Sequence, residues 1–427
     1  MADVAIVLLA GRLFVRLSRR LRQPPVVAEI AIGITLGPSV LGLLPGDLTE
    51  RLFPYDALPM LSAVAQVGLL AFMFLAGWEM DVGQLRSRGR SVGVMAGLSM
   101  ATPLLIGAGA AALLAERYAG SGRSTTAFVL FLSTAFAITA FPVLARIITD
   151  SGLSGTRVGT TAMACAAVGD VLAWCVLVLV VAVSEAGSPA NFLTVVGLTV
   201  AYGLVMARVV RPLLRFAVRR SSRASSGANT LALIASGVFL SAWVTSWIGI
   251  HAIFGAFAFG LVMPREAREE LHANVSAPLS GIVALLLPVF FVVTGLSVDV
   301  GALGLVGLGY LALILCVAVL GKYAGAVLPA RMSGMSWREA GAFATLMNTR
   351  GLTEIVILNV GRELGVIGPE MFTMMVIMAL VTTAMAGPLL HVLGITRAAG
   401  APRASGHRTP ASAGSGVGPA PAVKARP

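Results

Sequence analysis

Charged residues are scarce in this chain, and their scarcity decides its class. Only 12% of the 427 residues are Asp, Glu, Lys or Arg, whereas 57% are hydrophobic and the mean hydropathy is +0.90. A soluble protein of this composition would lack the polar surface needed to cover its core. The sequence therefore excludes a soluble globular domain and indicates an all-α polytopic membrane protein.

Cysteine and histidine are also few. The three cysteines, Cys165, Cys175 and Cys316, all lie inside apolar segments, which argues against a disulfide framework and against a zinc site. The four histidines form no metal-ligand cluster, and no hydrolase or redox constellation is present. We therefore expect neither an enzyme nor a cofactor or metal centre. No nucleotide-binding domain is recognisable either.

Long apolar segments are what the chain does have. About thirteen of them are of a length that crosses a bilayer, separated by charged or Pro/Gly breaks. They fall roughly at 3–19, 24–44, 59–79, 91–115, 124–148, 157–183, 190–210, 228–247, 249–264, 276–297, 303–329, 337–360 and 370–394.

The net charge of +12 is distributed unevenly over the loops. If the N-terminus is outside, the cytoplasmic loops and tail hold twenty-three basic residues and the external loops hold four. This bias predicts an N-out, C-in topology, and it explains the positive charge without a nucleic-acid partner. Residues 396–427 are rich in Ala, Gly, Pro and Arg, and we expect a disordered basic cytoplasmic tail.

The sequence also repeats itself. The segment 74–82 matches 292–300 at Gly, Asp and Val, and 33–38 resembles 260–264. The matched spans are seven apart, so the two halves run through the membrane in opposite directions, as in many secondary transporters. Chance similarity between apolar segments is the alternative. The expected organisation is a transmembrane domain over 1–395, with a repeat at about 1–183, a linker helix at about 190–210 and a second repeat at about 228–395.

Asp170 is a lone acid in the middle of the sixth apolar segment. A carboxylate at mid-membrane depth is costly, and such acids usually line an ion or proton pathway. A carboxylate can hold either a proton or a small cation but not both, so the two ligands would compete and exchange would be obligatory. The alternative is a structural acid bonded to neighbouring hydroxyls.

Two segments carry helix-breaking residues at matching positions of the two halves. Pro142 disfavours helix just before it in the fifth segment, and Asn348 to Gly351 interrupt the twelfth. Two interrupted helices that cross would direct free carbonyls and dipole ends at an ion, whereas two mildly kinked helices are the plain alternative. Arg350 and Glu354, four residues apart, lie on one helix face, as a structural bridge or with a direct role.

Lys322 is the only lysine inside an apolar segment. It is about 12 Å from the cytoplasmic end at 1.5 Å per residue, a long reach for a snorkelling side chain. The functional interpretation is an ion-pair partner for Asp170 that is released when a cation binds, and snorkelling is the alternative.

The remaining polar candidates lie near the ends of the segments. Glu29, Glu79 and Asp81 fall at the cytoplasmic side, where they would attract cations into a funnel or would be ordinary interfacial acids. His251 falls at the outer interface. An interfacial side chain is the ordinary interpretation there, and a pH-sensing role is the alternative.

Taken as a set, the motifs at 26–42, 139–146, 168–174 and 348–354 resemble the monovalent cation:proton antiporter-2 family, which includes Kef-type potassium efflux systems and bacterial sodium/proton antiporters. The resemblance covers residues 1 to about 395. It implies thirteen helices, inverted repeats with two interrupted crossing helices, and a homodimer with a dimerisation domain and a core domain that moves like an elevator. It places Asp170, Thr139 and Lys322 at the cation- and proton-binding site.

One position departs from the family pattern. Gly169 stands where the family usually has Asp, Asn or Gln, immediately before the essential aspartate. The missing carboxylate favours one-for-one electroneutral exchange, with altered ion choice or impaired transport as alternatives. We therefore expect an antiporter of Na⁺ or K⁺ against H⁺, in contact with membrane lipid. A gated K⁺ efflux pathway and a non-transporting sensor on the same fold are the other candidate functions.

Overall fold

The computed structural model is built of helices. It describes residues 6–9, 11, 23–45, 48–54, 56, 58–79, 90–119, 124–185, 189–224, 227–264 and 271–395. In these residues the only β-type pairing is an isolated antiparallel bridge between Ala119 and Ile367. The predicted all-α fold is confirmed. The tail at 396–427 lies outside the described residues.

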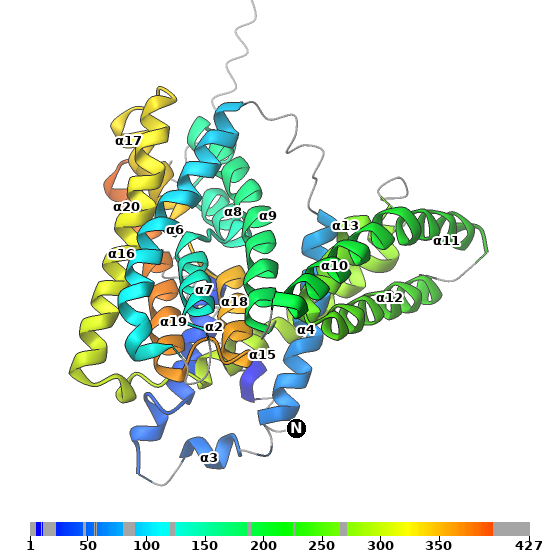
Figure 1. Ribbon diagram of the computed structural model, residues 1–427, viewed down its shortest axis with the longest axis horizontal. Helices are drawn as coiled ribbons and strands as arrows, with labels where there is room; N and C mark the ends of the chain where they lie inside the picture. Colours follow the sequence, from blue (N-terminus) through cyan, green and yellow to red (C-terminus); the bar gives the residue numbers. More distant parts are fainter. Residues whose placement is uncertain are drawn as a thin grey trace, which may run out of the picture.

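Each predicted segment from the second to the thirteenth corresponds to a helix or a pair of helices (Figure 1). Within the described ranges, eight helical stretches are long and apolar enough to cross a membrane, and one of them, His272–Met332, holds both α15 and α16. The elements are α2 (Pro25–Leu36), η1 (Leu41–Leu43), α3 (Leu48–Leu52), α4 (Leu58–Glu79), α6 (Arg90–Tyr118), α7 (Thr125–Ala137), α8 (Phe141–Asp150), α9 (Arg157–Glu185), α10 (Pro189–Val205), η2 (Met206–Val210), α11 (Arg211–Ala224), α12 (Gly227–Ile248), α13 (Ala252–Val262), η3 (His272–Ser276), α15 (Ala277–Leu296), η4 (Gly301–Leu303), α16 (Gly304–Met332), α17 (Trp337–Met347), α18 (Leu352–Glu363), α19 (Pro369–Ala384) and α20 (Ala386–Val392).

The helix expected at about 190–210 is longer than the sequence predicts. Helical structure continues from α10 through the π turn η2 into α11, which ends at Ala224 rather than near residue 210. The predicted end near residue 210 rests on the length of the apolar segment, which marks only the part of a helix that crosses the membrane. The Arg-rich continuation is polar, but arginine is a good helix former, so the helix does not stop where the apolar segment does.

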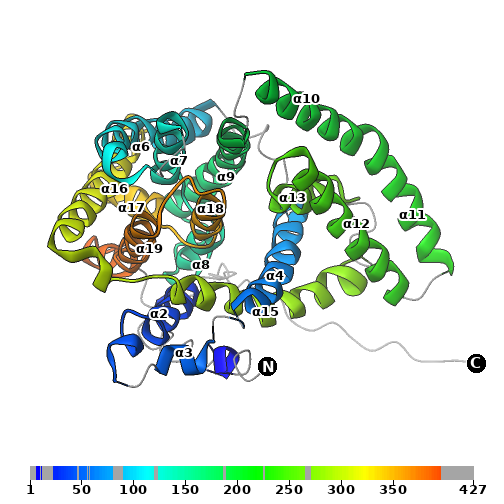
Figure 2. The same ribbon diagram turned by 60° about the horizontal axis from the view of Figure 1, so that its bottom comes forward.

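The helices pack in two groups (Figure 2). We call α2, α4, α10 to α13 and α15 the scaffold, and α6 to α9 with α16 to α20 the core. In the scaffold α4 packs against both α13 and α15, and in the core α6 packs against α7 and α16. The two interrupted helices, α7/α8 and α17/α18, both belong to the core.

Close glycine contacts in the scaffold follow the inverted repeat. A Cβ on Gly33 of α2 would lie 2.6 Å from Gly295 Cα of α15, and a Cβ on Gly260 of α13 would lie 2.1 Å from Phe74 O of α4, close to Gly77. The repeat equates Gly33 with Gly260 and Gly77 with Gly295. Each half therefore supplies one glycine of each pair, and both crossings bring helix backbones together where no side chain fits.

Local sequence explains both interruptions. The backbone is extended at Ile138 and Ala140, and α8 begins at Phe141 with Pro142 in its first turn, where the missing N–H costs no helix bond. In the second interruption Gly351 has φ 156°, and a Cβ there would lie 2.7 Å from Val143 Cγ2. The predicted breaks are confirmed at 138–140 and 348–351.

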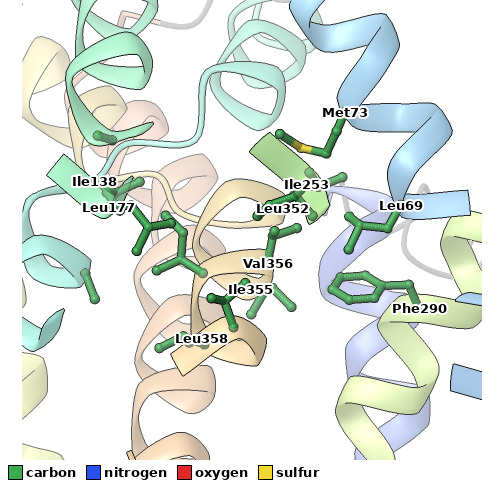
Figure 3. Close-up of a cluster of buried hydrophobic side chains, with 14 of the residues drawn as sticks. Leu69, Met73, Ile138, Leu177, Ile253, Phe290, Leu352, Ile355, Val356 and Leu358 are labelled. Atoms are coloured by element: carbon green, nitrogen blue, oxygen red, sulfur yellow. The ribbon is translucent and has the colours of Figure 1, made fainter. Parts of the chain in front are cut away.

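Apolar side chains fill the boundary between core and scaffold (Figure 3). This boundary cluster is buried and draws on α4, α13 and α15 of the scaffold and on α9, α18 and the first interruption of the core. Its labelled members are Leu69, Met73, Ile138, Leu177, Ile253, Phe290, Leu352, Ile355, Val356 and Leu358. Contacts of this kind are non-directional, so they hold the two groups together without fixing one relative position.

Candidate functional site

The two interruptions cross and are tied to each other by hydrogen bonds. The Ala140 backbone N–H donates to Thr349 O over 3.1 Å, and the Thr139 hydroxyl donates to Met347 O over 2.7 Å. Four half-helices therefore end at one place inside the core. Helix ends leave unpaired backbone groups and partial charges, so this crossing places polar backbone groups inside the core.

Two cations cap the C-terminal end of α7. Lys322 Nζ donates to Ala137 O over 2.5 Å, while the Arg350 guanidinium donates to Ala135 O over 2.7 Å and to Phe136 O over 2.8 Å. These are the last three carbonyls of the helix, where the helix dipole is negative. The cations therefore satisfy carbonyls that the interruption of the helix leaves without partners.

Lys322 does not reach the membrane surface. Its side chain is 1% exposed and donates to Ala137 O and, over 2.7 Å, to Thr139 Oγ1. The snorkelling alternative is therefore wrong. The expected direct ion pair with Asp170 is not among the ion pairs of the described residues, although the two charges are close enough to interact. Lys322 binds the negative end of α7 instead.

Asp170 lies at the opposite, positive end of the same interruption. It projects from α9, is 5% exposed, and faces the Phe141 backbone N–H at the first residue of α8. Its Oδ1 has no hydrogen-bond partner among the described residues. Because a buried polar atom without a partner is costly, this carboxyl oxygen is where a proton or a cation would be accommodated. Nothing lies within 4 Å of a Cβ on the neighbouring Gly169.

Asn348 contributes a second unfilled oxygen acceptor. It caps the C-terminal end of α17, is 2% exposed, and its Oδ1 has no partner among the described residues. Asn348 is in the second interruption and Asp170 is beside the first. The crossing thus presents a carboxyl oxygen and an amide oxygen, which are ligands that hard cations prefer.

Arg350 and Glu354 form an ion pair inside the core. Their side chains are fully buried, with Nη1 3.0 Å from Oε1. The backbone of Arg350 is held as well, because its N–H donates to Thr383 Oγ1 over 2.9 Å and its carbonyl accepts from the same hydroxyl over 2.7 Å. One residue thereby joins α7, α18 and α19. The arrangement favours the structural-bridge interpretation of the pair.

The three acids predicted to form a cytoplasmic funnel are not equivalent. Glu29 is 8% exposed on α2 and interacts with the charge of Arg146 on α8, so it lies where the scaffold faces the core. Glu79 is exposed at the end of α4. Asp81 lies outside the described residues. Arg146, which pairs with Asp150 at 3.4 Å, was not singled out from the sequence, because nothing local marks it as a partner for Glu29.

The chain is similar to known proteins over most of its length. Residues 4–395 match the family described as "Sodium/hydrogen exchanger, transmembrane". The Na⁺/H⁺ antiporter NhaS4 of Synechocystis is 39% identical over 402 residues, which are 91% of this chain and 96% of that protein. A K⁺/H⁺ antiporter of Saccharomyces cerevisiae is 33% identical over 87% of this chain but only 44% of its own length. The chain therefore spans about half the length of this relative.

A solved structure has the same fold. The sodium proton antiporter MjNhaP1 of Methanocaldococcus jannaschii superposes with a TM-score of 0.63, covering 92% of this chain and 97% of that one, at 18% sequence identity. At this identity the likeness shows the arrangement of helices alone.

Proposed function

Since this chain belongs to the sodium/hydrogen exchanger family, we propose that it is a secondary-active antiporter that exchanges Na⁺ or K⁺ for H⁺. The observation that carries the proposal is the buried Asp170 carboxyl, whose Oδ1 lacks a partner at the crossing of two interrupted helices. A proton or a cation satisfies that oxygen, and each excludes the other. Transport of one ligand in one direction then requires transport of the other in return.

Two neighbouring groups are suited to bind the cation with Asp170. The Thr139 hydroxyl donates to Met347 O and accepts from Lys322, which leaves it one lone pair. Asn348 Oδ1 is unpartnered. In this proposal Lys322 orients the Thr139 hydroxyl and keeps a positive charge near the carboxylate, so the empty site is not left as an uncompensated buried anion.

Alternating access follows from the division into two groups of helices. We propose that the core moves against the scaffold across the apolar boundary cluster, carrying Asp170 between the two aqueous sides. The repeats at about 1–183 and 228–395, joined by the linker helix, would form the two halves of the exchanger, and two copies would assemble through their scaffolds. The loop charges support an N-out, C-in orientation in a bacterial plasma membrane, with the tail at 396–427 in the cytoplasm.

Gly169 bears on the stoichiometry. With no second carboxyl beside Asp170, one proton is the most that this pair of positions takes up, so exchange of one cation for one proton carries no net charge. The choice between Na⁺ and K⁺ is a separate question that a comparison of the alkali cations answers.

The test is exchange by purified protein in proteoliposomes. An outward proton gradient, with the vesicle interior acid, is imposed, Li⁺, Na⁺, K⁺ or Rb⁺ is added outside in turn, and internal pH is followed with a dye. We expect saturable, cation-dependent proton movement that Asp170→Asn reduces to the protein-free background. Asp150→Asn, on the exposed end of α8, is the matched control and should retain activity.

Unchanged exchange by the Asp170 variant would refute the site. Cation flux without coupled proton movement would indicate a channel, and no flux from folded protein would indicate a sensor.

A further inference from the structure

One end of the boundary between core and scaffold is polar. His251 Nε2 lies 2.9 Å from Glu363 Oε2, where His251 caps α13 of the scaffold and Glu363 ends α18 of the core. One turn earlier on α18, Asn359 Nδ2 donates to Thr294 Oγ1 of α15 over 3.1 Å. These contacts join the same two groups of helices that the boundary cluster joins through apolar side chains.

Polar and apolar contacts differ in how they respond to movement. Apolar surfaces exchange one set of neighbours for another at little cost, whereas a hydrogen bond at 2.9 Å exists in only one relative position of its two helices. Shifting the core past the scaffold by a few ångströms separates His251 from Glu363. Packed interfaces of this kind have discrete arrangements, so the pair belongs to one of them.

The protonation of His251 changes the strength of this contact. Its Nδ1 accepts the Ile253 N–H over 3.4 Å, so in the neutral ring Nε2 carries the hydrogen that Glu363 accepts. A second proton, bound at Nδ1, converts the hydrogen bond between neutral His251 and anionic Glu363 into an ion pair. The only bond lost is the long cap bond that Nδ1 accepts from the Ile253 N–H. The two side chains are 17% and 52% exposed, so protons from the adjacent aqueous phase reach them.

Few other charges face the pair in the described part of the chain. On the scaffold side, α12 and α13 carry no titratable side chain. The only titratable side chain of α4 is Glu79, at the end of that helix far from the pair, and η2 carries Arg208. On the core side Arg362 adjoins Glu363 and lies over the Phe372 ring at 5.1 Å, and α19 begins with Glu370 nearby. None of these comes between His251 and Glu363.

We propose that His251 and Glu363 form a latch that holds the core in one of its two positions against the scaffold, and that a proton on His251 tightens it. The proposal rests on the proposed exchange function, since it assigns the latch to one stage of that cycle. In the N-out topology the latch faces the external phase. External acid then slows the cycle by a route that is separate from proton competition at Asp170.

Transport at saturating cation concentration tests the latch, because competition at Asp170 is then suppressed and only the maximal rate is compared. External pH is lowered from 8 to 5.5 at constant internal pH. We expect this change in pH to lower the maximal rate of the wild type roughly two- to fivefold more than that of His251→Gln. A factor of this size corresponds to the stabilisation that one partly exposed ion pair provides. Glu363→Gln should behave like His251→Gln, and His251→Lys, with its permanent charge, should be slow at both pH values. His272→Gln, on η3, is the matched control and should keep the wild-type profile.

A second measurement does not depend on transport. Hydrogen–deuterium exchange in nanodiscs, corrected for intrinsic rates, should show the start of α13 and the end of α18 more protected at pH 5.5 than at pH 8, and His251→Gln should abolish the difference. A wild-type pH profile in His251→Gln together with unchanged protection overturns the latch and leaves the exchange function intact. Absent flux with pH-dependent protection overturns the exchange function and retains the latch.

Discussion

Lys322 Nζ donates to Thr139 Oγ1 over 2.7 Å, and this bond joins α16 to the first interruption of the core. The same ammonium binds Ala137 O, so one buried cation holds both the end of α7 and a residue of the break. Lys322 and Asp170 occupy opposite ends of the interruption, each beside the helix end whose partial charge it complements.

Replacing Lys322 should destabilise the core as well as alter exchange. Lys322→Ala leaves Ala137 O without its donor and opens a cavity, at a cost of about 2–4 kcal/mol. We expect a lower thermal midpoint by intrinsic fluorescence in detergent. Lys322→Gln retains an N–H donor and should lose less. Equal midpoints for the wild type and the alanine variant would contradict the capping role.

Cation binding at Asp170 should stabilise the folded protein. A ligand at 100 times its Kd adds about 2.7 kcal/mol, so the thermal midpoint should rise with the transported cation and not with choline. Because protons compete for the same carboxyl, the rise should grow as pH increases. Asp170→Asn should show no cation-dependent rise, while Asp150→Asn should match the wild type. A rise that persists in Asp170→Asn would place the cation elsewhere.

The Arg350–Glu354 pair offers a test by double-mutant cycle. Arg350→Met leaves Glu354 buried without its partner and should cost about 3–5 kcal/mol. Adding Glu354→Leu removes the stranded acid, so the double variant should be less destabilised than the sum of the two single variants. Additive losses in unfolding measurements would show that the two side chains act independently.

Gly169→Asp tests the stoichiometry directly. A Cβ at this position meets nothing within 4 Å, so the side chain should be tolerated. The added carboxyl supplies a second titratable group beside Asp170, and Na⁺/H⁺ exchange should change from voltage-independent to voltage-dependent. The membrane potential is set with K⁺ and valinomycin. Gly169→Asn, similar in size but without a charge, is the control. Voltage dependence already present in the wild type would overturn the electroneutral assignment.

The interruptions were predictable because their causes are local. Proline removes a helix donor wherever it stands, so Pro142 fixes the start of α8 to within its first turn. Gly351 adopts a φ that other residues avoid, and it sits in the motif that the sequence marks as a break. The repeat was predictable for a related reason, since glycines at close helix crossings recur at fixed positions in both halves.

The partners of the buried charges were not predictable in the same way. The bond from Lys322 to Ala137 spans 185 residues, and its acceptor is a backbone carbonyl, which every residue carries. From charge alone, Asp170 is the expected partner of Lys322. In the structure the partner of Lys322 is instead a backbone carbonyl at the end of α7. The contact between His251 and Glu363 spans 112 residues and depends on where α13 and α18 end, which apolar length does not fix.

The paired glycine crossings have a consequence for biosynthesis. The α2 surface at Gly33 is completed by Gly295 of α15, and the α4 surface at Gly77 is completed by Gly260 of α13. Both helices of the first half leave the ribosome long before their counterparts exist. Until α13 and α15 are inserted, the α2 surface at Gly33 and the α4 surface at Gly77 lack the helices that pack against them, so neither close crossing of the scaffold forms before the second half of the chain is made.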